Sequence, residues 1–174
     1  MAKILTSIHG KLIGLLANGA LSTKGLTRDE DSIVNATAAT LTVKPQTHAG
    51  KTITLNRAGG IAVTLPAAVG LGDEYEFIVG TTFTSSATIK VANATDTMVG
   101  SAVLAQDSAD TVVQFDTAAS SDPSTFAGST TGGLAGATVK LRDIKLDGTT
   151  AKWFVQVFSS ATGAEATPFS ATVS

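Results

Sequence analysis

The chain has 174 residues, enough for one well-buried core and too few for two comfortable domains, so one domain with terminal extensions is expected. Its formal charge is -2 and its 12 Lys and Arg residues are scattered, which argues against a nucleic-acid partner. Only 15% of the residues are charged, against roughly 25% in ordinary soluble domains, and this suits a protein that hides surface in an assembly. The absence of cysteine excludes disulfides, thiolate nucleophiles and cysteine-based zinc sites.

The N-terminal segment has a pattern of its own. Its apolar residues recur at helical spacing and are Ile4, Leu5, Ile8, Leu12, Leu15 and Leu16. Asn18-Gly19 would end such a helix, although Gly10 and Gly14 weaken it by about 1 kcal/mol each relative to alanine. The pattern predicts a partly helical arm, which either covers its own domain or docks on another subunit.

Residues 18–48 are mostly small and polar, and we interpret them as a linker that includes a short strand near Leu41–Lys44, closed by Pro45. Residues 1–48 are therefore assigned to an arm and linker, and residues 49–174 to the main domain. His9 to Lys11 interrupt the apolar run that follows Lys3, and no apolar stretch approaches 18 residues. The sequence thus indicates a protein made in the cytoplasm, without a membrane span.

From Lys51 onward, apolar and polar residues alternate with a period of two, which is typical of strands. Ile53 and Leu55 share one face, and the segments 61–65 and 75–79 follow the same pattern. Turn residues separate the strands at the roughly 8 to 12 residue spacing of sandwiches and barrels. Since nothing between them resembles a crossover helix, we expect an all-β fold, an antiparallel two-sheet β-sandwich.

Two strands carry further expectations. In "ATVKLRDIKL" the apolar phase shifts by one residue between Leu141 and Ile144, which predicts a bulge or corner at Arg142-Asp143. In "KWFVQVFSS" both alternating sets are apolar, so this strand is expected to be covered on both faces. One cover is the partner sheet. The other, over Phe154 and Phe158, is either a neighbouring subunit or a segment of the same chain.

The residues that could support catalysis are sparse. His9 and His48 lie in the arm and beside a turn, and no G-x-S-x-G segment offers a nucleophile for either of them. Asp29 to Asp31 lack the spacing of a calcium loop, and Asp107 and Asp110 lack the aromatic platforms of a sugar hydrolase. We therefore expect neither an enzyme nor a cofactor or metal site.

The glycine-rich run "GSTTGGLAG" also lacks the features of a phosphate-binding loop. It has no G-K-[ST] ending and leads into a strand, so the helix N-terminus that holds the phosphate is missing. Gly132 and Gly133 are better explained as turn residues with positive φ.

Four phrases in order resemble a pattern in structural proteins of tailed bacteriophages: "TLPAAVGLGDEYEFIVGTT", "IKVANATDTMVG", "TTGGLAGATVKLRDI" and "KWFVQVFSSATGAEATPFS". The pattern is similar to the jelly-roll domain of capsid decoration, or cement, proteins and covers roughly residues 50–170. The resemblance implies a homotrimer on the outer surface of the virion head, bound to the major capsid protein and stabilising the shell by association alone.

Two hypotheses follow from these patterns. In the preferred one, the chain is a capsid cement protein whose N-terminal stripe contacts the shell or an adjacent trimer, with Phe154 and Phe158 at the trimer interface. In the alternative, it is a receptor- or glycan-binding head of a phage tail fibre or spike. That head would use exposed Thr, Ser and Asn loops such as "TTFTSSAT" and "SSDPSTF".

Overall fold

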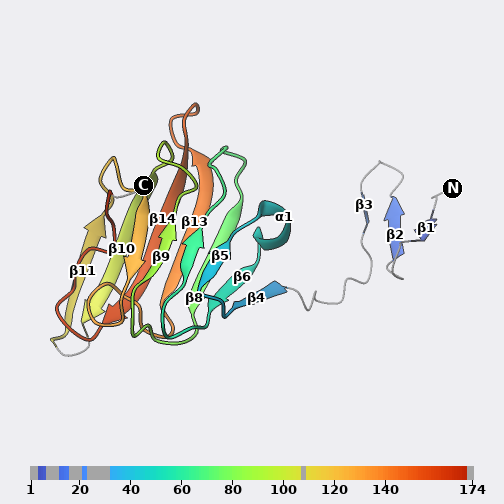
Figure 1. Cartoon of the computed structure of the whole chain (residues 1–174). Coiled ribbons are helices and arrows are strands. Elements are labelled where there is room, and N and C mark those ends of the chain that lie inside the picture. The colour runs from blue at the N-terminus through green and yellow to red at the C-terminus, as the bar shows by residue number, and fades with distance from the viewer. Residues whose placement is uncertain (1–3, 7–11, 16–20, 23–31, 107–108, 172–174) are drawn as a thin grey trace. The chain divides into compact units, whose positions relative to one another are not determined.

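The computed structural model describes residues 4–6, 12–15, 21–22, 32–106 and 109–171. The chain divides into two compact units, residues 1–32 and residues 33–174. In the first unit, β1 (Ile4–Thr6), β2 (Leu12–Leu15) and β3 (Leu21–Ser22) form an antiparallel sheet in the order β1-β2-β3 (Figure 1). Residues 33–48, assigned above to the arm and linker, contribute elements to the second unit.

The helical arm predicted from the N-terminal stripe is wrong where the structure describes it. Ile4 and Leu5 belong to β1, and Leu12 and Leu15 belong to β2. The physical reason lies in the glycines that weakened the helix: Gly14 sits within β2, directly opposite Ile4 of β1. Ile8 and Leu16 lie outside the described residues.

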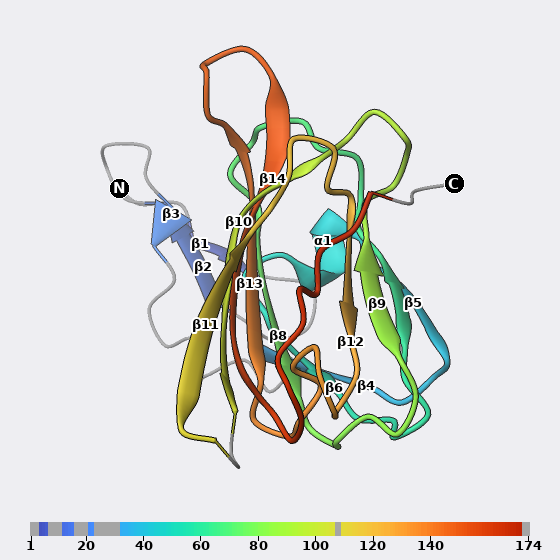
Figure 2. The same ribbon diagram turned by 90° about the vertical axis from the view of Figure 1, so that its left-hand side faces the viewer.

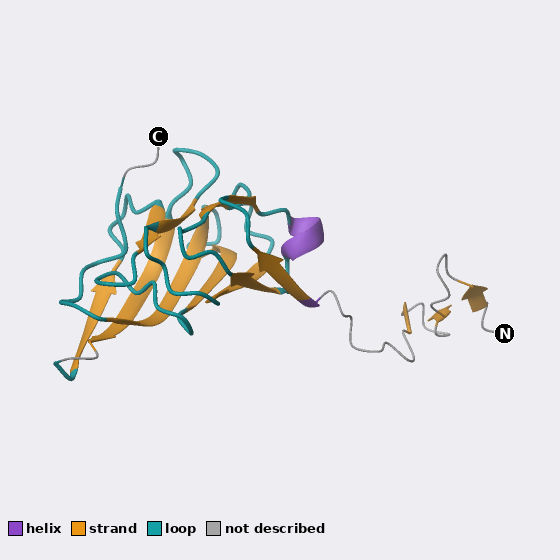
Figure 3. Ribbon diagram, turned by 60° about the horizontal axis from the view of Figure 1, so that its bottom comes forward, coloured by secondary structure: helices purple, strands orange, loops and turns teal. Residues whose placement is uncertain are grey.

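The second unit is built almost entirely from strands (Figure 3). Its elements are β4 (Ile33–Ala36), β5 (Thr40–Thr42), α1 (Pro45–His48), β6 (Thr52–Leu55), β7 (Ala62–Thr64), β8 (Glu74–Val79), β9 (Ala87–Lys90), β10 (Met98–Gln106), β11 (Thr111–Asp116), β12 (Pro123–Phe126), β13 (Thr138–Lys145) and β14 (Ala151–Ala161). They form a seven-stranded sheet, β11-β10-β14-β13-β8-β6-β4, and a four-stranded sheet, β12-β9-β7-β5. Figure 2 views the two layers from the side, with β13 and β8 in one and β9 and β5 in the other. The all-β prediction is confirmed.

Both sheets are mixed, whereas the sequence led us to expect antiparallel ones. β4, β6 and β8 run parallel in one sheet, and β5, β7 and β9 run parallel in the other. β10 and β14 are also parallel, while β13 is antiparallel to both of its neighbours. The argument against parallel pairs assumed that each needs a crossover helix. Here the chain alternates between the sheets, so each strand in one sheet serves as the crossover for the other.

The core lies between the sheets and uses the alternation seen in the sequence. One row of inward-facing residues crosses all seven strands: Val34, Ile53, Phe77, Val139, Val157, Ala102 and Phe115. The five between the two ends of this row are buried. Ile61, Val63 and Leu65, predicted on one face, are buried as well. The period-two pattern therefore identified the inner face correctly.

The bulge predicted at Arg142-Asp143 is wrong. β13 pairs with β14 without interruption from Thr138 to Lys145. The inward position that the apolar phase skips is occupied by Asp143, which is 1% exposed. The irregularity lies on the neighbouring segment, where the main chains of Gly72 and Asp73 both hydrogen-bond to the main chain of Asp143. The shift in the apolar pattern of β13 is therefore caused by a buried carboxylate at an inward position.

The segment "SSDPSTF" was also expected as an exposed loop, and the structure corrects this. Pro123–Phe126 form β12, which pairs with β9, and Ser121, Asp122 and Ser124 are buried. Residues near the C-terminus cover this strand, since Thr125 donates a main-chain hydrogen bond to Pro168 and Ser124 forms a bridge with Phe169. In this segment Ser120 is exposed, whereas in the other predicted loop Thr82, Thr84, Ser85 and Ser86 are all exposed.

Candidate functional site

Asp143 anchors the loop between β7 and β8 through its side chain. Its carboxylate accepts hydrogen bonds from three successive main-chain N–H groups: Val69 at 3.1 Å, Gly70 at 2.7 and 2.8 Å, and Leu71 at 3.2 Å. Ala68, just before them, donates to the carboxylate of Asp96 at 2.9 Å. Because charged acceptors form stronger hydrogen bonds than neutral ones, the loop is held firmly on the end of the sheet.

The anchored loop exposes aliphatic side chains. Val69 is 50% exposed and Leu71 is 80% exposed, and Leu146, in the turn after β13, is 60% exposed. Hydrogen bonds of Gly72 and Asp73 with the main chain of Asp143 place the loop beside the end of β13, and a Cβ at Gly70 would lie 2.4 Å from Cγ of Lys145. The turn between β13 and β14 projects from the end of the sandwich (Figure 2). We call Val69, Leu71 and Leu146 the apolar knob.

The turn that carries Leu146 is ordered by its own aspartate. The Asp147 carboxylate accepts hydrogen bonds from the main-chain N–H groups of Thr149 at 2.9 Å and Thr150 at 2.6 Å. These bonds, led by the one from Thr150, hold the pKa of Asp147 well below its usual value. The knob residues therefore belong to two segments, and a carboxylate fixes the conformation of each. This limits the conformational entropy that the two segments lose when a partner binds.

An aromatic pair lies behind the anchored loop. The rings of Tyr75 and Trp153 have centroids 5.7 Å apart at 54°, and both side chains are buried. Burial raises the pKa of Tyr75 from 10.0 to about 12, with smaller effects from the carboxylates of Asp73 and Asp143. Trp153 lies opposite Asp143 in the ladder between β13 and β14, so this pair supports the same end of the sheet.

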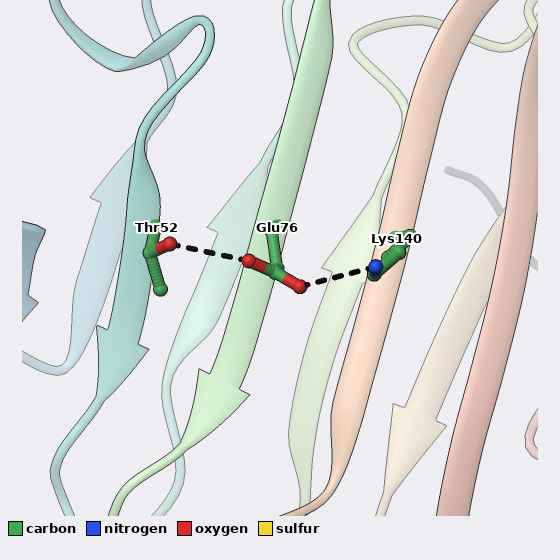
Figure 4. Close-up of polar contacts among 3 residues, drawn as sticks. All are labelled: Thr52, Glu76 and Lys140. Atoms are coloured by element: carbon green, nitrogen blue, oxygen red, sulfur yellow. Dashed lines mark hydrogen bonds and ion pairs between the residues drawn. The ribbon is translucent and has the colours of Figure 1, made fainter. Parts of the chain in front are cut away.

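The outer face of the seven-stranded sheet carries one row with charged residues. In Figure 4, Thr52 of β6, Glu76 of β8 and Lys140 of β13 lie side by side. The Thr52 hydroxyl donates to Oε2 of Glu76 at 3.2 Å, and Nζ of Lys140 lies 3.4 Å from its Oε1. Arg142 pairs with Glu74 in the same way one step along the strands. Both pairs bring opposite charges together, and the row through Glu76 and Lys140 ends on β11 at the exposed carboxylate of Asp116.

The adjacent row on this face has no charge. It crosses all seven strands through Asn35, Thr54, Ile78, Thr138, Phe158, Val103 and Gln114, and we call it the uncharged row. Phe158, expected at a trimer interface, is 57% exposed, and Phe154 is half-buried on the same face. No segment among the described residues covers Phe158 to the extent expected for the second face of β14.

Of the candidate catalytic residues, His48 and Asp110 lie in the described part of the chain, and no cluster of three or more His, Asp or Glu side chains there could hold a metal ion. His48 closes α1, where its Nδ1 accepts a hydrogen bond from the Lys44 main chain at 3.0 Å. Asp110 begins the turn into β11 with a φ of 50°, while Asp107, His9 and residues 29–31 lie outside the described residues.

The glycine run is a turn, as predicted, with one difference. Gly132 has a φ of +86°, whereas Gly133 has no positive φ and is required for space. A Cβ at Gly133 would lie 2.8 Å from the Phe83 ring and 2.8 Å from the carbonyl carbon of Ala127. Within the described segments, no helix is long and apolar enough to cross a membrane.

The knob and its anchor were not predicted from the sequence. The shift in apolar phase after Leu141 was interpreted as a bulge or corner at Arg142-Asp143. A signal was present, because a polar residue at an inward strand position requires hydrogen-bonding partners. A loop such as "PAAVGLGD", rich in free N–H groups, is a suitable source of them.

Neither a protein-family model nor a curated protein sequence matches this chain.

Proposed function

We propose that this chain is a structural virion protein: a capsid decoration, or cement, protein that binds the outside of a tailed-phage head as a homotrimer and stabilises the shell. Its partner is the major capsid protein. The proposal starts from the resemblance of residues 50–170 to cement proteins. The structural observation that carries it is the apolar knob, in which Leu71 is 80% and Leu146 is 60% exposed on rigidly held turns.

The knob fits a contact with a shell better than a contact with an isolated protein. Full burial of an aliphatic side chain contributes about 1.5–3 kcal/mol, so three of them give modest binding at a single site. A regular shell offers the same site many times, and a trimer engages several at once. Linked contacts then add through effective concentration, and weak binding becomes stable attachment.

The jelly-roll assignment belongs to this proposal. Two packed sheets around one apolar core support a sandwich of the kind found in cement proteins. The parallel pairs β4-β6-β8 and β5-β7-β9 depart from an antiparallel jelly roll. We propose that the sandwich serves the same role, that of a rigid body which presents contact residues at its end and on its face.

The test uses shells assembled from the major capsid protein of the phage genome that carries this gene, prepared without decoration. Co-sedimentation should show saturable binding of the full-length chain. Leu71→Ser with Leu146→Ser should weaken this binding at least tenfold and leave the mass of the oligomer unchanged. Val113→Ser is the matched control and should bind normally, because Val113 is 36% exposed and lies opposite the inward-facing Leu104, away from the knob and from the outer face.

The same assay tests the N-terminal stripe. Deletion of residues 1–17 should abolish capsid binding while the sandwich remains folded, and unchanged binding would remove the stripe from the contact. Failure of the full-length chain to bind any shell would overturn the proposed function. If the double serine variant binds as tightly as the wild type, the knob is not part of the capsid contact, and the proposed function itself is unaffected.

A receptor- or glycan-binding head of a tail fibre is the second candidate. It is favoured by a hollow lined with hydroxyl groups, to which Thr82, Thr84, Ser85, Ser86 and Thr162 contribute. All five residues are exposed. Saturable binding to a glycan array that is lost in Ser85→Ala with Ser86→Ala would favour this candidate over the capsid.

A further inference from the structure

The uncharged row is unusual because it runs unbroken across the whole outer face of the larger sheet. Each step is a direct cross-strand pair, from Asn35 on the edge strand β4 to Gln114 on the edge strand β11. Next to it, Ser160, Ala105 and Val112 form a second uncharged line over three strands. Solvent-facing sheet surfaces normally carry charged side chains, so this strip resembles an interface.

Phe158 and Val112 are the exposed apolar residues of this strip. Phe158 is 57% exposed on β14, which has a strand on each side, and Val112 is 67% exposed on β11. Val103 and Ala105 of β10 lie between them in the ladder and are half-buried. Together they form a continuous apolar patch on the outer face.

We propose that a second copy of this chain packs on the outer face of the seven-stranded sheet, with Phe158 at the centre of the contact. The inference rests on the proposed function, in which the chain is a trimer, and names the surface where its subunits meet. In a trimer, three such faces surround the symmetry axis.

The charge pattern of the face favours a second copy as the occupant. In a ring of three, one part of this face meets a different part of the next copy, and an uncharged strip allows this without opposing like charges. In the flanking row, Glu76 and Lys140 are paired within one subunit at 3.4 Å, and Asp116 lies on the edge strand β11, away from the centre of the face. A partner of opposite charge would find no matching surface on this strip.

The size of the face is also sufficient. Strands lie about 4.8 Å apart and successive same-face residues about 6.7 Å apart, so the uncharged row over seven strands and the second line over three strands cover roughly 320 Å². The flanking row of Glu76 and Lys140 adds roughly 230 Å², and the sum of about 550 Å² per copy exceeds the roughly 500 Å² per partner of the smallest specific interfaces. The apolar knob, with three side chains, offers much less and is not suited to hold two copies together.

The experiment measures the mass of the purified full-length chain by light scattering over a dilution series. The wild type should give a multiple of 17.5 kDa, three in the proposed trimer. Phe158→Ser should raise the concentration at which the oligomer dissociates by at least tenfold, as expected from the lost burial of an aromatic side chain. Thr138→Lys, which places a charge in the uncharged row, should do the same.

Thr42→Lys is the matched control, because Thr42 is exposed on β5 of the four-stranded sheet and lies outside this face. It should leave the dissociation concentration unchanged, and thermal melting should show that all three variants are folded. A wild-type monomer at every concentration overturns the inference, and so does an oligomer that tolerates both Phe158→Ser and Thr138→Lys. An oligomer that dissociates as expected but binds no shell would contradict the proposed function alone.

Discussion

The carboxylate of Asp143 accepts two hydrogen bonds from the main-chain N–H of Gly70, at 2.7 and 2.8 Å. This contact joins residues 73 positions apart and connects the middle of the sheet to the loop that carries the apolar knob. A buried carboxylate is stable there because three successive N–H groups point at it. The loop and the strand therefore depend on each other for their conformations.

Replacing Asp143 should destabilise the protein according to how many hydrogen bonds the new residue retains. Asp143→Asn keeps one acceptor oxygen and should lower the free energy of unfolding by roughly 1–2 kcal/mol. Asp143→Ala leaves the three N–H groups without an acceptor and should cost about 3 kcal/mol or more. Denaturant unfolding monitored by fluorescence of the single tryptophan, Trp153, measures both.

Asp116→Asn is the control, since Asp116 is exposed on the edge strand β11. Its effect should stay within about 0.5 kcal/mol. Equal stability of Asp143→Ala and the wild type would show that the loop does not need the carboxylate.

Gly100 permits β10 and β14 to approach each other. Its φ is +149°, and a Cβ there would lie 1.8 Å from the carbonyl oxygen of Val155. Gly100→Ala should therefore lower the free energy of unfolding by more than about 3 kcal/mol, since the backbone cannot yield locally. Thermal unfolding of the purified variant measures this loss.

Gly136→Ala separates steric overlap from backbone strain. Gly136 also has a positive φ, +93°, but nothing lies within 4 Å of a Cβ at that position. We expect a cost of about 1 kcal/mol from the φ alone. Similar losses at the two glycines would argue against a special role for the close contact at Val155.

Tyr75 should make stability depend on alkaline pH. Its folded-state pKa is raised to about 12 from the ordinary 10.0, chiefly by burial. The neutral phenol is thus favoured in the folded state, so its contribution is complete below pH 10 and is lost as the pH rises toward 12. A shift of two pH units corresponds to about 2–3 kcal/mol.

The measurement compares denaturant unfolding of the wild type and Tyr75→Phe from pH 8 to pH 11. The wild type should lose more stability above pH 10 than the variant, because only the wild type must deprotonate this hydroxyl on unfolding. Parallel curves for the two proteins would show that Tyr75 titrates normally in the folded state.

The Glu76–Lys140 pair should contribute little to stability by itself. Its side chains are 36% and 59% exposed, and exposed pairs are typically worth less than about 1 kcal/mol. A double-mutant cycle with Glu76→Gln and Lys140→Gln should give a coupling energy of about 0.2–1 kcal/mol that falls with added salt. A coupling of several kcal/mol would mean that this face is desolvated, as in a subunit contact.

Local patterns in the sequence were sufficient for much of the fold. Alternation at Ile53 and Leu55, and at Tyr75, Phe77 and Val79, identified strands and their inward faces because side chains alternate across a sheet. The turn at Gly132 was found because few residues other than glycine adopt positive φ.

Other expectations failed where distant residues decided the outcome. The stripe from Ile4 to Leu15 has helical spacing, but the structure pairs Ile4 with Gly14 across two strands. The strand directions could not be predicted, because no short sequence pattern shows that β4 to β9 alternate between the two sheets. Phe158 was placed on the outer face of β14 correctly, while what covers that face was left open.

By itself, the sequence determined that the chain is built from strands and which residues of each strand face inward, because both depend on a period of two within a few residues. The tertiary structure decided the strand order, the buried role of Asp143 and the exposure of Leu71 and Leu146. These features depend on which segments pair across the sheets. The pairing minimises the free energy of the whole core, and that free energy cannot be evaluated from a short stretch of the sequence.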